Sequence, residues 1–346
     1  MSDSLSLDIF NQDAFSAISL SAAVDKIDYV PNFLDSMPGL FEQDSVRTEQ
    51  IWIEERSTGA VVLQTSPRGT PPKNEGMDIR KARSFRTVRI ADASRVLPSE
   101  LQNIRAFGTA DQLMSLQIEI SRRQQKIKRN MALTWENLKL GAVQGSALDA
   151  DGSTIYNWAT EFSQSIPAEI NFDLENASPA SGAVRKLCTE VVRSIRRGLK
   201  GKPMSRIVGI CGDAFWDDFT AHKEVRETYK NWAAAADLRN DVGAAWSGFR
   251  YGEINFFNYR GTDDNSTVAV PNTKCKFFPV GSGIFRWAMS PGESFEFVNT
   301  PGQLVYSRIV LDKDRNSWAD VEEYSYPLPI CTMPQALAAG KNTSGG

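Results

Sequence analysis

The side chains that most often carry catalysis or hold metals are sparse in this chain of 346 residues. His222 is the single histidine, so zinc sites built on several histidines, including the HExxH helix, are excluded. A Ser-His-Asp triad would have to use His222, and no GxSxG turn accompanies it. We interpret His222 as a surface or hydrogen-bonded structural residue. The sequence predicts a protein that is not an enzyme and uses no cofactor or metal.

Two loops come close to ligand-binding patterns without completing them. Residues 198–203 (GLKGKP) contain the glycines and lysine of a phosphate loop, but the first glycine is misplaced and Pro203 stands where Ser or Thr is required. Four residues match positions 1, 3, 5 and 12 of a calcium loop: Asp312, Asp314, Asn316 and Glu323. Ser317 replaces the required glycine of that loop, and its flanks are typical of strands. A polar hairpin turn is the better interpretation.

The four cysteines are isolated from one another in the sequence, at Cys188, Cys211, Cys275 and Cys331. They form no CxxC pair, and scattered thiols in a reducing compartment are more often packing residues than a disulfide or zinc set. The N-terminus lacks a basic start followed by an apolar run, so we expect no signal peptide. We also expect no membrane span, because no window approaches about 20 apolar residues.

Composition indicates a folded protein whose main role is not to grip nucleic acid. The net charge is -3 and the isoelectric point about 5.5. With 41% hydrophobic and 10% aromatic residues, the chain can build a core.

The strongest structural signal is a helix from about Thr109 to Gly141. Apolar residues recur there at spacings of three, four and seven, and the opposite face is basic. Thr109 with Asp111 fits an N-terminal cap, and Gly141 fits a stop. About 30 residues make a rod roughly 45 Å long. A single apolar stripe cannot bury itself, so the rod is either a long core helix or the spine of an assembling protein.

The segments before the rod contain too little apolar surface to fold alone. Residues 1–45 read as an arm, and residues 46–95 as two strands, the second at 82–90, joined by a polar tip. An isolated hairpin is marginal in water, so this one should pack on another chain or project from the body. An ordinary exposed hairpin stays open as an alternative. The expected inter-subunit contact residues are Trp52, Arg56, Arg68, Lys73, Arg80, Arg83, Phe85, Arg86 and Arg89.

The remainder of the chain alternates helices and strands. We expect helices at Ser181–Leu199 and Asp213–Ala236, and a mobile polar tail at 340–346. A tight Asp-Gly turn should join strands at Ser146–Asp149 and Ser153–Trp158. The other expected strands are Arg206–Cys211, Phe249–Tyr259, Lys274–Val280, Leu304–Leu311 and Ala319–Tyr326.

These pieces, in this order, resemble the lambda-type capsid E family of tailed-bacteriophage major capsid proteins. The hairpin tip at 67–72 (PRGTPP) resembles the family's tip, and 134–152 resembles its junction between spine helix and hairpin. Residues 325–329 (SYPLP) and Pro334 resemble its C-terminal strand. The resemblance covers nearly the whole chain. It implies the α+β tailed-phage capsid fold, which encapsulins and the herpesvirus capsid floor share.

On that resemblance the chain divides into the regions of the family's fold. The implied regions are an N-terminal arm (1–45), an E-loop (46–100), a P-domain with the spine helix (101–160), an A-domain (161–285), and P-domain return strands with the tail (286–346). Some shells of this fold carry Lys–Asn crosslinks. Lys73 and Asn74 lie in the loop tip, but nothing in the sequence marks a crosslink there.

The resemblance implies a major capsid protein that forms hexamers and pentamers, closing into an icosahedral shell around phage double-stranded DNA. The expected partners of the protein are further copies of itself, decoration and scaffolding proteins, a portal, and packaged DNA contacted without sequence specificity. No membrane partner is expected. The expected location is the virion capsid, after assembly in the bacterial host cytoplasm. The alternatives are an encapsulin-like nanocompartment shell, a gene-transfer particle, a soluble α/β enzyme, or a tail or adhesion protein.

Overall fold

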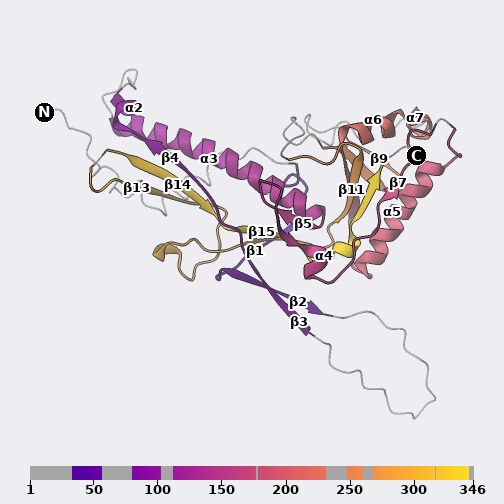
Figure 1. The fold of residues 1–346 in the computed structure, drawn as a ribbon, viewed down its shortest axis with the longest axis horizontal. Helices are drawn as coiled ribbons and strands as arrows, with labels where there is room; N and C mark the ends of the chain where they lie inside the picture. Colours follow the sequence, from indigo (N-terminus) through magenta and orange to yellow (C-terminus); the bar gives the residue numbers. More distant parts are fainter. Residues whose placement is uncertain are drawn as a thin grey trace, which may run out of the picture.

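The computed structural model describes residues 33–56, 80–102, 112–176, 178–230, 248–259, 268–315 and 317–342. A single long helix, α3 (Gln112–Val143), joins two sheets that lie at opposite ends of an elongated molecule (Figure 1). The helix is 32 residues long, about three times the usual length. From Ile120 onward its apolar stripe is buried, by different partners along the helix.

One end of the molecule is a three-stranded antiparallel sheet beneath the first half of α3. Its order is β13-β14-β4, with bounds Tyr306–Leu311, Ala319–Ser325 and Ile90–Val96. Ile127, Met131 and Trp135 of α3 form a cluster with Trp287 and Val305. A short helix, α2 (Pro98–Gln102), follows β4.

The other end is a six-stranded mixed sheet. Its order is β7-β16-β11-β8-β10-β9, with bounds Ile170–Asn171, Ala338–Lys341, Lys274–Val280, Arg206–Cys211, Ile254–Asn258 and Gly248–Tyr251. β8 and β10 are parallel, whereas β11 runs antiparallel to both β8 and β16.

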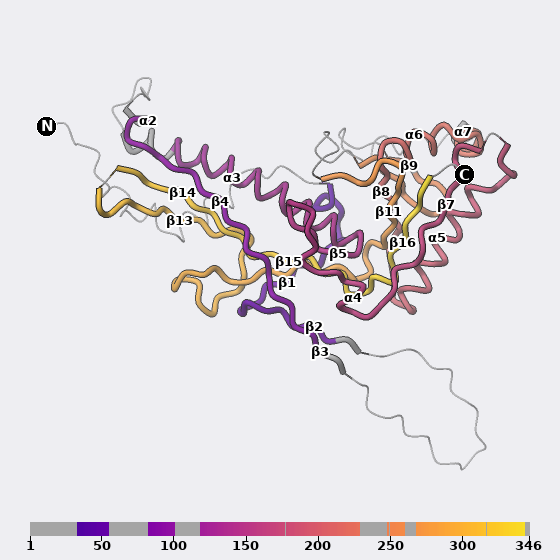
Figure 2. The backbone as a smooth tube through the Cα atoms, viewed as in Figure 1, coloured from indigo at the N-terminus to yellow at the C-terminus, as the bar shows by residue number. Residues whose placement is uncertain are grey.

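Both faces of this sheet are covered. Neighbouring residues of a strand point to opposite faces. Phe256 of β10 lies 4.3 Å from the ring of Phe219 in the helical layer, and Phe257 lies 5.3 Å from the ring of Phe33 on the other side. The helical layer comprises α5, α6 and α7 (Figure 2), with bounds Ala183–Leu199, Asp213–Ala221 and Lys223–Lys230.

Short strands connect the two ends. β1 (Phe41–Ser45) runs parallel to β12, and β12 pairs with β15. Below this junction β2 and β3 form a separate two-stranded ladder (Figure 1). The bounds not yet given are β12 Phe285–Met289, β15 Pro327–Cys331, β2 Gln50–Arg56, β3 Arg80–Arg86, β5 Ser146–Leu148, β6 Thr154–Asn157, α4 Trp158–Glu161, η5 Phe295–Phe297 and η6 Pro334–Ala336.

The long helix is confirmed, but it does not stop at Gly141. It continues to Val143, and Gly145 with φ +97° then turns the chain. Gly141 instead permits close packing, because a Cβ there would lie 2.6 Å from the Ser146 carbonyl oxygen. The expected cap at Thr109 falls outside the described residues.

Several other bounds differ from expectation. The strand expected at 82–90 is two strands, β3 and β4, separated at residues 87–89, and the one expected at 249–259 turns at Gly252 and Glu253, both with positive φ. His222 separates α6 from α7, so no single helix runs from 213, and residues 231–236 fall outside the described part. The basic face expected on α3 is also interrupted, because Lys128 is 8% exposed beside Glu323.

The expected polar tail is wrong for its first residues. Ala338–Lys341 form β16, which pairs with β11 and β7 inside the six-stranded sheet. Asn342 is buried, and its side chain accepts from the Leu174 amide at 2.9 Å and donates to Asp218 at 2.7 Å. The last strand therefore belongs to the sheet of 161–285 and not with the return strands of 286–346.

Candidate inter-subunit surface

The described part of the hairpin is anchored to its own subunit through one face. Ile51, Ile53 and Phe85 are buried. The Phe85 ring lies 5.4 Å from that of Trp158 and 5.6 Å from that of Tyr156. The expectation that Phe85 contacts a neighbour is therefore corrected, because the side chain is used inside the subunit.

The opposite face of the hairpin carries an exposed aromatic residue. Trp52 lies between Ile51 and Ile53 in β2, so its side chain points away from the anchored face, and it is 63% exposed. Across the ladder it faces Ser84, which is too small to cover it. A large aromatic group left in solvent gains free energy when a partner buries it. Of the expected contact residues, Trp52 is the one whose exposure suits that role best.

Three of the expected arginines have partners within the subunit. Arg86 pairs with Glu49 at 3.0 Å, Arg89 pairs with Glu293 at 3.2 Å, and Arg83 lies over the Phe162 ring. Exposed ion pairs of this kind contribute about 0–1 kcal/mol, so a neighbour can exchange them at little cost. Arg56 and Arg80 face each other in register, with side chains that are not described. Arg68 and Lys73 lie outside the described residues.

A second exposed apolar surface lies on the loop after β12. Phe295 is 98% exposed and Val298 65% exposed, whereas Phe297 between them is buried against Tyr306 at 4.6 Å. This pair has no counterpart in the sequence predictions. The available signal was 290–302 (SPGESFEFVNTPG), where apolar residues stand inside a run of Pro, Gly and Ser that cannot form a core strand.

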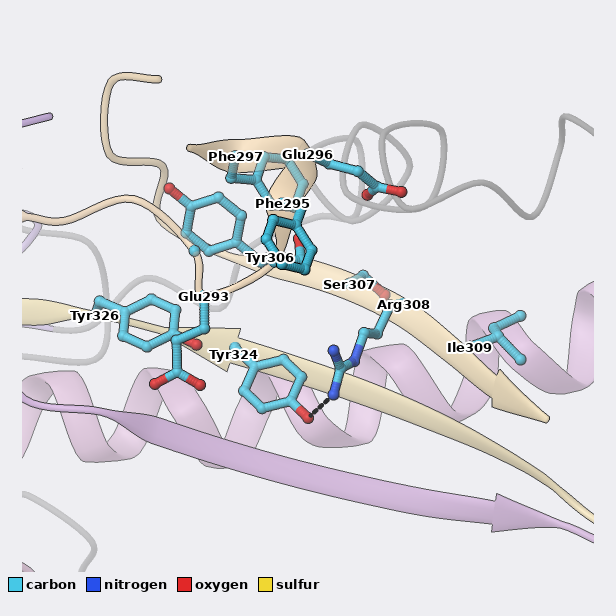
Figure 3. A pocket seen from close by; sticks show the side chains of 12 residues that line it. Glu293, Phe295, Glu296, Phe297, Tyr306, Ser307, Arg308, Ile309, Tyr324 and Tyr326 are labelled. Atoms are coloured by element: carbon cyan, nitrogen blue, oxygen red, sulfur yellow. Dashed lines mark hydrogen bonds between the residues drawn. The ribbon is translucent and has the colours of Figure 1, made fainter. Parts of the chain in front are cut away.

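This loop walls a pocket of about 360 Å³ over β13 and β14 (Figure 3). The Arg308 side chain donates to Tyr324 Oη at 2.8 Å and pairs with Glu322 at 2.7 Å, which fixes its guanidinium at the rim. The lining includes Phe295, Tyr306, Tyr324 and Tyr326 and contains neither a histidine nor a cysteine. The arrangement suits burial of an apolar or aromatic group better than acid-base chemistry.

Buried titratable groups hold the body together. Glu136 of α3 accepts from Tyr259 Oη at 2.9 Å and from the Leu34 amide at 3.3 Å, and burial raises its pKa to about 7. Lys139, one turn further, pairs with Asp35 and lies 4.2 Å from the Trp287 ring centre. These contacts fasten Leu34 and Asp35 to the spine helix.

The patterns that suggested ligand chemistry resolve into structural roles. Both Asp312 carboxylate oxygens accept from the turn, including the amides of Asp314, Arg315 and Ser317, which is the polar hairpin turn expected there. Glu323 lies within β14, fully buried. Buried His222 accepts from the Glu224 amide through Nδ1.

The cysteines fill packing positions in the described structure. All four cysteines are buried and free, as packing residues would be. Within the described ranges, no three His, Cys, Asp or Glu side chains gather into a metal site, and no helix has the length and apolarity to cross a membrane.

Comparisons with known proteins agree on one family. The model of the family described as phage major capsid protein E matches residues 16–342. The major capsid protein of Pseudomonas phage KPP10 is 24% identical over 334 residues, covering 90% of this chain and 93% of that protein. The major capsid protein of Salmonella phage Felix O1 is 25% identical over 285 residues, covering 73% and 76%.

Solved structures share the fold at low identity. A prophage protein of E. coli CFT073 that is assigned as a capsid protein superposes with a TM-score of 0.54 and 15% identity, over 94% of this chain and 99% of that one. A chain from Gordonia phage Cozz gives 0.51 and 9%, over 89% and 86%. The family model covers nearly the whole chain, and the solved structures share its fold. The chain therefore belongs to the phage major capsid protein E family.

Proposed function

We propose that this protein is the major structural subunit of a tailed-phage capsid, assembling as hexamers and pentamers into an icosahedral shell around double-stranded DNA. The observation that carries the proposal is the family match across 16–342. It is supported by a subunit that exposes Trp52 and Phe295 on surfaces separate from its closed core. The role is structural and requires no catalytic residue.

The proposed regions follow the fold with one adjustment. The arm is 1–45, the E-loop 46–100, the P-domain 101–160 with the return strands from 286, and the A-domain 161–285 together with β16. Rings of one kind of subunit need head-to-tail contacts, and obligate interfaces often exceed 2,000 Å². An arm and a projecting hairpin can supply such area.

The proposed partners follow from assembly. Further copies of the chain are the main partner, at contacts that include Trp52 and the arginines of the hairpin. A portal, scaffolding proteins and decoration proteins are further proposed partners, and assembly in the host cytoplasm is the proposed setting. Packaged DNA would be held through its phosphates and without base readout.

Negative-stain microscopy and sedimentation of the purified full chain test the proposal. We expect closed shells or ring-shaped capsomers at micromolar concentration. A variant lacking 59–78 should keep the folded body, measured by circular dichroism and a cooperative melt, but form no shells. A full chain that stays monomeric at high concentration would contradict the proposed function, and normal shells from the deletion variant would remove the hairpin from it.

A further inference from the structure

One surface of this acidic protein is strongly basic. Residues 185–206 contain eight Lys or Arg and a single Glu, so the rest of the chain has a net charge of -10. All eight cations are exposed: Arg185, Lys186, Arg193, Arg196, Arg197, Lys200, Lys202 and Arg206. We name this surface, formed by α5, the turn after it and the first residue of β8, the α5 basic stripe.

The helix geometry concentrates these charges on one side. The opposite side of α5 is apolar and packs on the six-stranded sheet through Val184, Cys188, Val191 and Ile195. Lys186, Arg193 and Arg197 are spaced by seven and four residues, which places them on nearly one line along the helix. The segment 185–200 is about 24 Å long at 1.5 Å per residue. In Figure 1 α5 lies on the outer side of the sheet, away from the spine helix.

Stabilisation of the subunit itself explains only some of the cations in the stripe. Arg196 and Arg197 lie in the last turn of α5, where cations interact favourably with the helix dipole. Arg196 also pairs with Glu253 at 3.0 Å. Among the described residues, the other seven cations form no ion pair with an acidic group. A solvated helix face needs charge, but it does not need charge of one sign.

We propose that the α5 basic stripe is the surface through which the shell contacts the phosphates of double-stranded DNA. This inference rests on the proposed function and adds the place of contact. A row of exposed cations on a rigid helix neutralises phosphates without reading bases. The stripe is strongly positive whereas the rest of the chain carries a net negative charge, so a polyanion that approaches the subunit is drawn toward α5.

The alternative binding partner for the stripe is an acidic protein, and the stripe suits a protein less well than it suits DNA. Protein interfaces deplete lysine and favour aromatic anchors at their centres. The large exposed aromatic side chains among the described residues, Trp52 and Phe295, are on the hairpin and the loop after β12. The described residues of the stripe include no large exposed apolar side chain.

The test is DNA binding by the full chain with three stripe charges removed. The variant Lys186→Gln, Arg193→Gln, Arg197→Gln is compared with a matched control on α3, Arg122→Gln, Lys126→Gln, Arg129→Gln. The two variants lose the same charge from exposed helical positions. Binding of a labelled 20-base-pair duplex is followed by fluorescence anisotropy between 50 and 200 mM salt.

We expect the stripe variant to bind about tenfold or more weakly at 50 mM salt. Its plot of log affinity against log salt should be shallower by roughly 2–3, because each phosphate that the protein no longer neutralises reduces the slope by about 0.9. The control should change affinity less than about twofold. The charge-conserving variant Arg193→Lys, Arg197→Lys should bind like the parent, which separates charge from any folding defect.

Three outcomes would overturn the inference. The first is that both triple variants weaken DNA binding equally, and the second is that the stripe variant binds DNA like the parent. The third is that the stripe variant binds DNA normally but forms no shells, which would assign the stripe to an acidic protein partner. Microscopy of the same preparations keeps the proposed function separate. A parent chain that forms shells while its stripe variant binds DNA normally refutes only the placement on α5.

Discussion

The two ends of the spine helix use aromatic residues in opposite ways. At the six-stranded sheet, Phe215, Phe219, Phe256 and Phe277 are all fully buried and contact one another across β10, β11 and α6. At the three-stranded sheet, Phe295 is 98% exposed on a loop beside a pocket. The hairpin below the junction adds Trp52.

This difference in exposure separates residues that stabilise one subunit from residues available for contact between subunits. The six-stranded end satisfies its apolar surface within one subunit, so its residues should matter for folding. The exposed aromatic residues, Phe295 beside the three-stranded sheet and Trp52 on the hairpin, should contribute little to the stability of one subunit and gain free energy only when a second copy covers them. Matched substitutions at the two ends can test whether that division holds.

The largest expected effect is on the closed end. Phe277→Ala removes a ring that lies 5.7 Å from Phe256 and 5.9 Å from Phe172 in a tightly packed layer. We expect the free energy of unfolding to fall by about 3–5 kcal/mol. Denaturant titration of the unassembled protein measures it. The matched control Phe295→Ala should cost less than about 0.5 kcal/mol, and equal decreases would show that the loop after β12 packs on the subunit after all.

A smaller effect should come from the buried acid of the three-stranded sheet. Burial raises the pKa of Glu323 from 4.5 to about 8, with Lys128 lowering it and Asp92 raising it to a lesser extent. A raised folded-state pKa favours the neutral carboxyl, so its contribution is complete below pH 4.5 and is lost as pH rises to 8.

Glu323→Gln should therefore remove a pH dependence. We expect the variant to gain stability relative to the parent progressively between about pH 5 and 8, with the largest gain at the upper end. The measurement is the change with pH of the difference in unfolding free energy, which cancels any constant effect of the amide. A difference that stays constant from about pH 4.5 to 8 would mean that Glu323 is already ionised in the folded protein beside Lys128.

The sequence predicted the elements that carry strong periodicity. The spine helix and α5 follow from regular apolar spacing, because burial along one face imposes that spacing. β8 and β11 follow from short apolar runs, because both faces of their sheet are buried. β16 was missed because Ala338, Ala339 and Gly340 have no β-branched side chain. They form a strand because small residues fit there: a Cβ on Gly340 would lie 2.7 Å from the Phe172 ring.

The candidate site was less predictable than the fold. Phe85 and Trp52 both lie in charged, β-prone segments, and spacing alone did not reveal which face packs on Trp158. That choice depends on α4 and β6, which lie far along the chain from the hairpin. The exposed Phe295 is likewise a tertiary result, since a loop phenylalanine in sequence looks the same whether covered or not.

The smallest expected effect on the subunit is the sharpest test of the comparison. Ile51 and Trp52 are neighbours in β2 that face opposite ways, one 2% and the other 63% exposed. Ile51→Ala should cost about 2–4 kcal/mol in unfolding free energy, because it leaves a cavity against the body. Trp52→Ala should cost less than about 0.5 kcal/mol, and yet it should reduce shell yield in microscopy and sedimentation, since an interface loses an aromatic anchor. Wild-type shell yield with Trp52→Ala would place the assembly contacts elsewhere on the hairpin. A large decrease in subunit stability would instead show that Trp52 packs within its own chain. The contrast between aromatic residues that serve folding and those that serve assembly would then fail on the hairpin.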